Sequence, residues 1–157
     1  MIEVIKFSEL SEDEKVDICT MAHRILTRFH GKSSFIANNT NEEISIERYA
    51  KLIKNFKGSV AFDSFNNVMF FYKKVRVKDC FAVREEFKRA AASDPVEGGN
   101  AVYIDFFVAE ANKNNKESVA RFLSKLNVSF AVYNKKGSPH VEQIEALLGK
   151  IEKMPVK

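Results

Sequence analysis

The run Ala101–Ala109 places the strongest constraint on how this chain folds. It reads AVYIDFFVA, so both of its alternating faces are apolar except at Asp105. A strand of this kind is typical of the centre of a sheet that is covered on both sides. A polar loop and an amphipathic helix follow it, and the apolar positions of that helix are Val119, Phe122, Leu123 and Leu126. A loop between a buried strand and a helix N-terminus is a common anion-binding place in α/β proteins, so this segment is the first candidate for a ligand site.

The N-terminal third predicts one strand and two helices. Alternation over Ile2–Phe7 predicts the strand. Ser11 and Glu14 have the spacing of a capping box, which predicts a helix from there to about His30. Apolar residues at helical spacing predict a second helix over about 42–56.

Two strands, Ser59–Phe65 and Val68–Lys78, are predicted next, and Asn66-Asn67 between them favours a hairpin turn because Asn tolerates positive φ. A third helix is predicted over Asp79–Ala92. The remaining elements are a strand over Val128–Tyr133 and a last helix that begins at Ser138-Pro139, a cap followed by Pro at the first helical position. The resulting order predicts an α/β (α+β) fold, a mixed sheet flanked by helices, in a single domain over residues 1–157.

Composition fits such a domain and restricts its environment. The chain has 157 residues, 45% of them hydrophobic, which suffices for one core. Cys19 and Cys80 are far apart, which favours a reducing compartment, and Cys19 on an apolar helical face is interpreted as a small buried hydrophobe. No apolar run is long enough for a membrane span and the N-terminus lacks the layout of a signal peptide, so a cytoplasmic, intracellular protein without membrane contact is expected.

Two segments, 115–118 (NKES) and 122–127 (FLSKLN), together with the element order, resemble the GNAT superfamily of N-acetyltransferases. Members of that superfamily often place an Asn-x-x-Ala/Ser helix start after a strand and a Phe/Leu-x-Lys-x-Gly-Phe run before the next strand. The resemblance implies a GNAT-like acyl-CoA N-acyltransferase fold, acetyl-CoA as the cofactor and an amine as the acceptor. It also implies that Asn115 is the family's Asn at the helix start.

The chain departs from the family at the cofactor site. The family holds the CoA pyrophosphate on a Gln/Arg-x-x-Gly-x-Gly/Ala loop, where glycine lets backbone N–H groups approach the phosphates. Neither candidate loop, 78–83 or 111–115, contains glycine. The place of the family's general-acid Tyr falls on Phe122 or Leu123, which have no ionisable group. The resemblance is therefore to a degenerate member.

Two functions follow from this resemblance. The first is a non-catalytic GNAT-like binding or structural protein, and the superfamily's degenerate copies include phage particle proteins, so a virion component is one form of this hypothesis. The alternative is a CoA-dependent N-acetyltransferase. The missing glycines favour the first, whereas the usual activity of the fold favours the second.

Three residues are candidates for acid–base catalysis. Asp105 lies among apolar residues, and burial raises the pKa of a carboxyl toward that of a general base. An Asp at a sheet edge or paired with a Lys is the alternative. Glu110 ends the strand beside the polar loop, where it is either a base or a solvated surface residue. Tyr133 lies near the end of its strand, where it either donates a proton or packs its ring.

The polar loop and the helix start supply the candidate cofactor-binding residues, which are Asn112, Lys113, Asn115, Lys116 and Ser118. Lysine charges beside a helix N-terminus attract phosphate. A plain polar surface loop has the same composition, and this alternative stays open.

The middle of the chain is its basic part, with 10 basic and 4 acidic residues over 51–92. A patch that could bind nucleic acid, acidic phosphates or a protein assembly is predicted from Lys73, Lys74, Arg76, Lys78, Arg84 and Lys88. A solvated strand face over a Phe-rich core is the alternative. His23 and His30 lie about 10 Å apart along one predicted helix, and no Cys/His/Asp/Glu set has metal-ligand spacing, so no metal is predicted.

Overall fold

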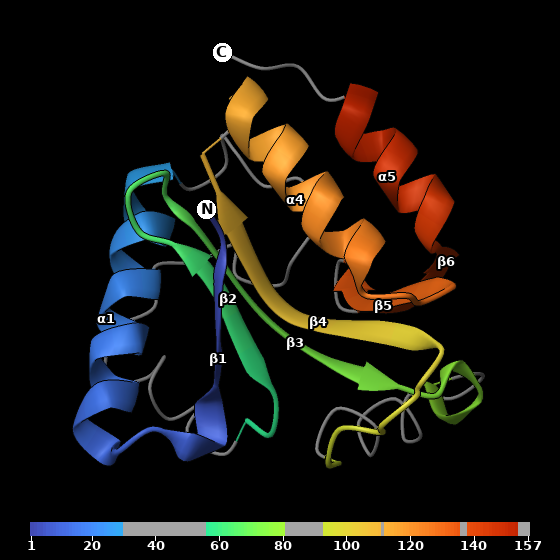
Figure 1. Cartoon of the computed structure of the whole chain (residues 1–157), viewed down its shortest axis with the longest axis horizontal. Coiled ribbons are helices and arrows are strands. Elements are labelled where there is room, and N and C mark those ends of the chain that lie inside the picture. The colour runs from blue at the N-terminus through green and yellow to red at the C-terminus, as the bar shows by residue number, and fades with distance from the viewer. Residues whose placement is uncertain (30–55, 81–92, 111, 136–137, 154–157) are drawn as a thin grey trace.

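The computed structural model describes residues 1–29, 56–80, 93–110, 112–135 and 138–153 (Figure 1). The strands are β1 (Glu3–Lys6), β2 (Ser59–Asp63), β3 (Val68–Val75), β4 (Ala101–Ala109), β5 (Phe130–Lys135) and β6 (Ser138–Gln143). The α-helices in the described part are α1 (Glu12–Phe29), α4 (Lys113–Lys125) and α5 (Ile144–Lys153). Short 3₁₀ helices are η1 (Phe7–Glu9) and η2 (Val77–Cys80).

The six strands form one mixed sheet in the order β1-β2-β3-β4-β5-β6. Every neighbouring pair is antiparallel except β4 and β5, which are parallel and joined through α4. A parallel pair needs such a crossover connection, whereas β5 and β6 need only a short one. The predicted α/β class with a mixed sheet is therefore confirmed.

Helices cover the sheet from both sides (Figure 1). α1 packs on one face, where Cys19, Ile25 and Phe71 are in one buried cluster. α4 and α5 pack on the other face, and their residues Leu123 and Ile151 belong to a larger cluster. β3 contributes residues to both clusters. β4 contributes to the larger cluster and, through Ala101 and Tyr103, to a third cluster on the opposite face, which explains why Ala101–Ala109 is apolar on both faces.

Local signals account for several element ends. The Ser11 hydroxyl accepts from the Glu14 N–H at 3.2 Å and the Glu14 carboxylate accepts from the Ser11 N–H at 3.0 Å, so the predicted capping box is confirmed. Asn67 has φ of 57° in the β2–β3 turn, as predicted for a hairpin. Asn127, after α4, has φ of 56°. Asn occupies this left-handed region more readily than most residues, and glycine is not required there.

The C-terminal segment differs from the prediction. Ser138-Pro139 opens strand β6, and helix α5 begins only at Ile144. β6 pairs with β5 alone in the sheet, and an edge strand tolerates a residue that lacks the backbone N–H. The predicted helix start was wrong because a cap followed by Pro has the same local sequence as this edge strand.

Other boundaries also move. β2 ends at Asp63 rather than Phe65, and β5 runs over Phe130–Lys135 rather than Val128–Tyr133. β3 ends at Val75 and η2 follows, so the predicted strand to Lys78 was three residues too long. α4 begins at Lys113, within the segment expected to be a loop. The helices predicted over 42–56 and 79–92 lie outside the described residues, apart from Phe56 and the 3₁₀ residues before Phe81.

Candidate functional site

The connection from β4 to α4 is closed by side chains of the chain itself. Asn112 has extended backbone, and its side-chain oxygen accepts a hydrogen bond of 2.8 Å from the backbone N–H of Asn115. This is ordinary N-capping, which satisfies one of the backbone donors at the helix start. A donor that a bound phosphate would use is therefore already paired.

Asn115 fastens this connection to the β2–β3 turn. Its side chain is fully buried, and its Nδ2 donates to the carbonyl oxygens of Asn66, at 2.9 Å, and Glu110, at 2.8 Å. A second link runs beside it, since the Glu110 N–H donates to the Asn67 carbonyl and the Asn67 amide donates to the Glu110 carboxylate at 3.1 Å. Asn115 and Glu110 thus hold two segments of the fold together.

Two of the remaining predicted cofactor residues also make internal contacts. The Lys116 ammonium donates to the carbonyl oxygen of Glu152 at 2.6 Å, near the end of α5. The Ser118 hydroxyl donates to the Asn115 carbonyl at 3.3 Å. Lys113 is exposed at the first position of α4. The five predicted cofactor residues therefore do lie together, but most of their hydrogen-bonding groups are engaged within the protein.

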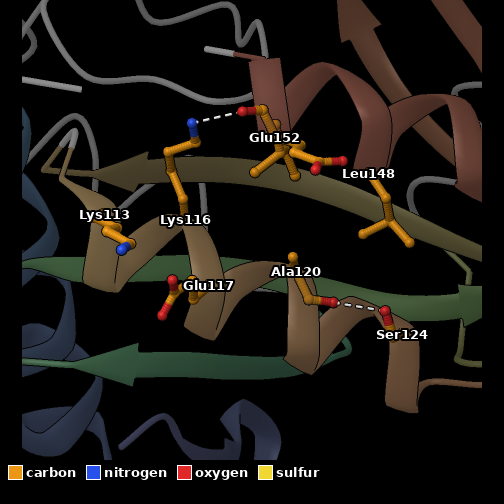
Figure 2. A pocket seen from close by; sticks show the side chains of 8 residues that line it. Lys113, Lys116, Glu117, Ala120, Ser124, Leu148 and Glu152 are labelled. Atoms are coloured by element: carbon orange, nitrogen blue, oxygen red, sulfur yellow. Dashed lines mark hydrogen bonds between the residues drawn. The ribbon is translucent and has the colours of Figure 1, made fainter. Parts of the chain in front are cut away.

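A groove of ≈ 490 Å³ lies between α4 and α5, next to this connection (Figure 2). Its lining residues are Lys113, Lys116, Glu117, Ala120, Ser124, Leu148, Ile151 and Glu152. Side chains from both helices face it, with charged groups toward the α4 N-terminus and apolar groups further along (Figure 2). It is large enough for a small molecule or for a side chain of another protein.

Asp105 occupies a β-bulge in β4. Phe71 pairs with Phe106 whereas Tyr72 pairs with Ile104, so Asp105 is an extra residue opposite β3. Bulges commonly redirect a side chain, and Asp105 is an exposed residue of the strand although its carboxyl is partly enclosed beside Tyr103. The sequence left open a buried Asp, an Asp at a sheet edge and an Asp paired with a Lys, and it could not show the bulge, which depends on the pairing with β3.

Desolvation and two neighbouring groups shift the pKa of the Asp105 carboxyl in opposite directions. Surrounding protein raises its pKa, and this outweighs the hydrogen bond from the Tyr103 hydroxyl, at 3.3 Å, and the charge of Lys73, which both lower it. Lys73 is itself 2% exposed, donates to the Ser93 carbonyl, and lies 5.7 Å from the centre of the Tyr103 ring. Tyr103, Lys73 and Asp105 form one polar group on the sheet.

β4 extends beyond its pairing with β5. The parallel pairing joins Ala101–Ile104 to Phe130–Tyr133, whereas pairing with β3 continues to Ala109. Within the described strands, the stretch from the bulge to Ala109 therefore has a ladder partner on the β3 side only. An extended backbone of this kind is able to hydrogen-bond to an extended ligand.

Tyr133 belongs to a different group on the face covered by α4 and α5. Its hydroxyl donates to Glu142 at 2.6 Å, and the Lys150 ammonium donates to the other carboxylate oxygen at 2.6 Å. His140 packs against the Tyr133 ring at 5.1 Å, and its Nε2 lies 3.7 Å from Glu142. Among the described residues that buried nitrogen has no hydrogen-bond partner.

The pKa values of Glu142 and Tyr133 are shifted in opposite directions by their surroundings. Burial alone would raise the pKa of Glu142, but hydrogen bonds from Lys150 and Tyr133 and the nearby charges lower it below its usual value. Burial and the neighbouring carboxylate raise the pKa of Tyr133. A phenol in this environment holds its proton more tightly, which makes Tyr133 a poorer acid.

The three predicted catalytic residues do not meet in one site. Tyr133 packs in the cluster under α4 and α5, together with Ile104, its partner on β4. Asp105 contacts Tyr103, whose cluster lies on the other face of the sheet. Glu110 is bound to Asn67 at the far end of β4.

The predicted basic patch is divided in the structure. Lys73 is buried, so its ammonium does not reach the surface. Lys74 is half-buried, and Arg76 and Lys78 are exposed after the end of β3. The predicted members Arg84 and Lys88 lie outside the described residues.

Three further features concern metal-ligand grouping, membrane-spanning helices and Cys19. Within its described residues, no three His, Cys, Asp or Glu side chains are grouped as a metal site would require, and no helix is long and apolar enough to cross a membrane. Cys19 is 1% exposed and burial raises the pKa of its thiol to about 11, which agrees with its interpretation as a buried hydrophobe.

His140, Glu142 and Lys150 were not among the predicted site residues. The alternation of Val141 between His140 and Glu142 was a strand signal, but the Ser-Pro pair before it favoured a helix.

In comparisons with known proteins, no family model, curated protein or solved structure matches the chain. The functional argument therefore depends on the residues themselves.

Proposed function

We propose that this chain is a non-catalytic, GNAT-like binding domain in which the acetyl-CoA site has been replaced by internal hydrogen bonds. The order of its elements and a mixed sheet with one parallel pair support a GNAT-like arrangement. The partner in this proposal is a protein assembly, of which a phage particle is one example. Arg76 and Lys78, after β3, are the exposed members of the predicted basic patch in the described residues, and they would contact it.

One observation carries this proposal, namely the closed connection between β4 and α4. A diphosphate bound at a helix start needs backbone N–H groups that are free and closely approachable. Here the Asn115 N–H is taken by Asn112, and the Asn115 side chain ties Glu110 to the β2–β3 turn. No glycine stands in this connection to let a phosphate approach.

The proposal predicts that millimolar acetyl-CoA leaves the thermal unfolding temperature unchanged. A ligand at 100 times its Kd adds about 2.7 kcal/mol to the free energy of unfolding, which raises Tm by roughly 5–10 °C for a domain of this size. CoA without the acetyl group is the control for non-specific phosphate effects. A saturable shift that Lys113→Ala weakens would contradict the proposal, because Lys113 is the exposed cation at the start of α4.

An N-acetyltransferase is the second candidate, and the divergence of β4 from β5 favours it. The backbone of β4 beyond Ile104 pairs with β3 only, and the amide groups of CoA's extended arm are suitable partners for such a strand. Asp105 begins this stretch, and its raised pKa suits a general base. Acetyl transfer to an amine that is lost in Asp105→Asn, with stability retained, would establish this function instead.

Nucleic acid is the alternative partner for the basic residues near the end of β3. Lys74, Arg76 and Lys78 would release about three counterions, so log Kd would change with log salt by a slope of roughly 2.7. A protein partner recognised by packing would show a much weaker salt dependence. The measurement is a salt series with a duplex DNA fragment, and a steep slope that Lys78→Ala reduces would replace the protein partner with nucleic acid.

A further inference from the structure

Phe65 is a large aromatic side chain held in solvent. It is 91% exposed in the turn between β2 and β3. The turn is fixed by other residues, since the Asp63 carboxylate accepts from the backbone and side-chain amides of Asn66 at 3.1 and 2.7 Å. Asn67 supplies the positive φ. The turn therefore needs no aromatic residue at position 65, and a Phe there is available for contact with another molecule.

The groove between α4 and α5 is suitable for such a side chain. Its accessible apolar lining comes from the half-buried Ala120 and Leu148 (Figure 2), which lie over the fully buried Ile151, and its volume of ≈ 490 Å³ is ample for an aromatic ring. Phe65 does not fill the groove of its own chain, because it is almost fully exposed. The groove and the ring are thus two complementary features of one molecule that do not meet within it.

Both features lie on one end of the molecule. Asn66, next to Phe65, accepts a hydrogen bond from the Asn115 side chain, and Lys116, the next residue of α4, lines the groove. Lys116 also binds the α5 carbonyl of Glu152, so the α4 N-terminus contacts the β2–β3 turn through Asn115 and the α5 C-terminus through Lys116. A two-fold interface requires such an arrangement, in which one surface patch carries both halves of the contact.

The charges around the groove favour a second copy over a charged ligand. Its lining carries two lysines, Lys113 and Lys116, and two glutamates, Glu117 and Glu152. A polyanion or a polycation would meet as many like charges as opposite ones. A second copy of the chain carries the same balanced set of two lysines and two glutamates, so it meets no net repulsion at the groove.

We propose that the chain forms a symmetric homodimer in which Phe65 of each protomer enters the α4–α5 groove of the other. Burial of an aromatic anchor in a pocket is the contact that most often dominates an interface. The proposal does not depend on the absence of catalysis, and it applies equally to either candidate function.

Sedimentation equilibrium over a range of protein concentrations tests the proposal. The unmodified chain is expected to dimerise, and Phe65→Ser is expected to raise the dimer Kd by about 30-fold or more. Ala120→Trp, which fills the groove, is expected to do the same. Val16→Ser is the matched control, because Val16 is 50% exposed on α1, which covers the opposite face of the sheet, and it should leave the Kd unchanged.

A mixing experiment separates this contact from a general loss of folding. Phe65→Ser retains an intact groove and Ala120→Trp retains an intact Phe65, so an equimolar mixture restores one of the two contacts. A heterodimer tighter than either variant's homodimer is expected. A monomer at every concentration, or a dimer that neither substitution weakens more than Val16→Ser does, would overturn the proposal.

Discussion

Replacement of Asn115 by Ala tests whether this residue holds β4, α4 and the β2–β3 turn together. The substitution removes hydrogen bonds to the carbonyls of Asn66 and Glu110. Each such bond contributes about 0.5–1.5 kcal/mol, and a buried acceptor left unpaired costs about 1–3 kcal/mol. The Asn115 side chain is fully buried, but the acceptor residues Asn66 and Glu110 are half-buried, so water recovers some of this energy. We expect the free energy of unfolding to fall by about 3 kcal/mol.

The measurement is urea unfolding at equilibrium, supported by calorimetry. For a chain of this size the expected loss corresponds to a decrease in Tm of roughly 6–12 °C. The matched control is Asn114→Ala, an exposed residue on the same turn of α4, which should change stability by less than about 0.5 kcal/mol. The two variants differ by one position and have the same chemical change.

A second variant distinguishes hydrogen bonding from packing. Asn115→Asp keeps the shape of the side chain but replaces the Nδ2 donor with an oxygen that faces two carbonyls. We expect it to be at least as destabilising as Asn115→Ala, although its charge at a helix N-terminus offsets part of the loss. If Asn115→Asp were as stable as the unmodified chain, the role assigned to the two donated bonds would be refuted.

The remaining predictions concern the ionisation of Glu142 and the replacement of two glycines. Because the pKa of Glu142 is lowered in the folded chain, its ionisation stabilises the fold above the unfolded value of about 4.3, and this stabilisation is lost as pH falls. Tyr133→Phe and Lys150→Ala should each reduce the loss of stability between about pH 5 and 3, measured by urea unfolding at each pH, and an unchanged slope would contradict the assignment. Gly149→Ala should stabilise the fold by about 1 kcal/mol, because an added Cβ meets open space in a helix. Gly99→Ala should destabilise it, because the Cβ would lie 2.6 Å from the backbone oxygen of Val75 in β3. Thermal unfolding measures both, and equal effects would contradict both predictions.

Elements defined by local sequence could be predicted. The capping box of Ser11 and Glu14 depends on two residues three positions apart, and it is present with both hydrogen bonds. The bounds of β4, Ala101–Ala109, are those of the apolar run. Because both faces of the strand are covered, the apolar run ends where the strand ends. The Asn66-Asn67 turn follows from the backbone freedom of Asn67.

Features decided by pairing could not be predicted. Pro139 is compatible with a helix start or an edge strand, and its position opposite Asn134 of β5 selects the strand. The bulge at Asp105 exists only relative to Phe71 and Tyr72 of β3. The sequence of one strand gives no indication of which residue is extra, so the choice between a buried Asp105 and one at a sheet edge or beside a Lys could not be made from the sequence.

The candidate site shows the same division between local and distant information. The position of the site residues at the start of α4 could be predicted, because loop composition and helix periodicity are local. Their partners could not be predicted, since Asn115 binds Asn66, 49 positions away, and Lys116 binds Glu152, 36 positions away. Those distant contacts decide whether a polar loop is open to a ligand or closed by the protein.

Stability and cofactor binding compete for the same groups in this connection. A phosphate site keeps backbone donors unpaired until the ligand arrives, and this lowers the stability of the empty protein. Asn112 and Asn115 instead pair one helix N–H and two carbonyl oxygens within the protein, although the buried Oδ1 of Asn115 has no partner among the described residues. Under the proposed function, these internal bonds supply stability that a ligand would otherwise add. A large destabilisation in Asn115→Ala together with no response to acetyl-CoA is therefore a single expectation, and the two results should occur together if the connection is closed.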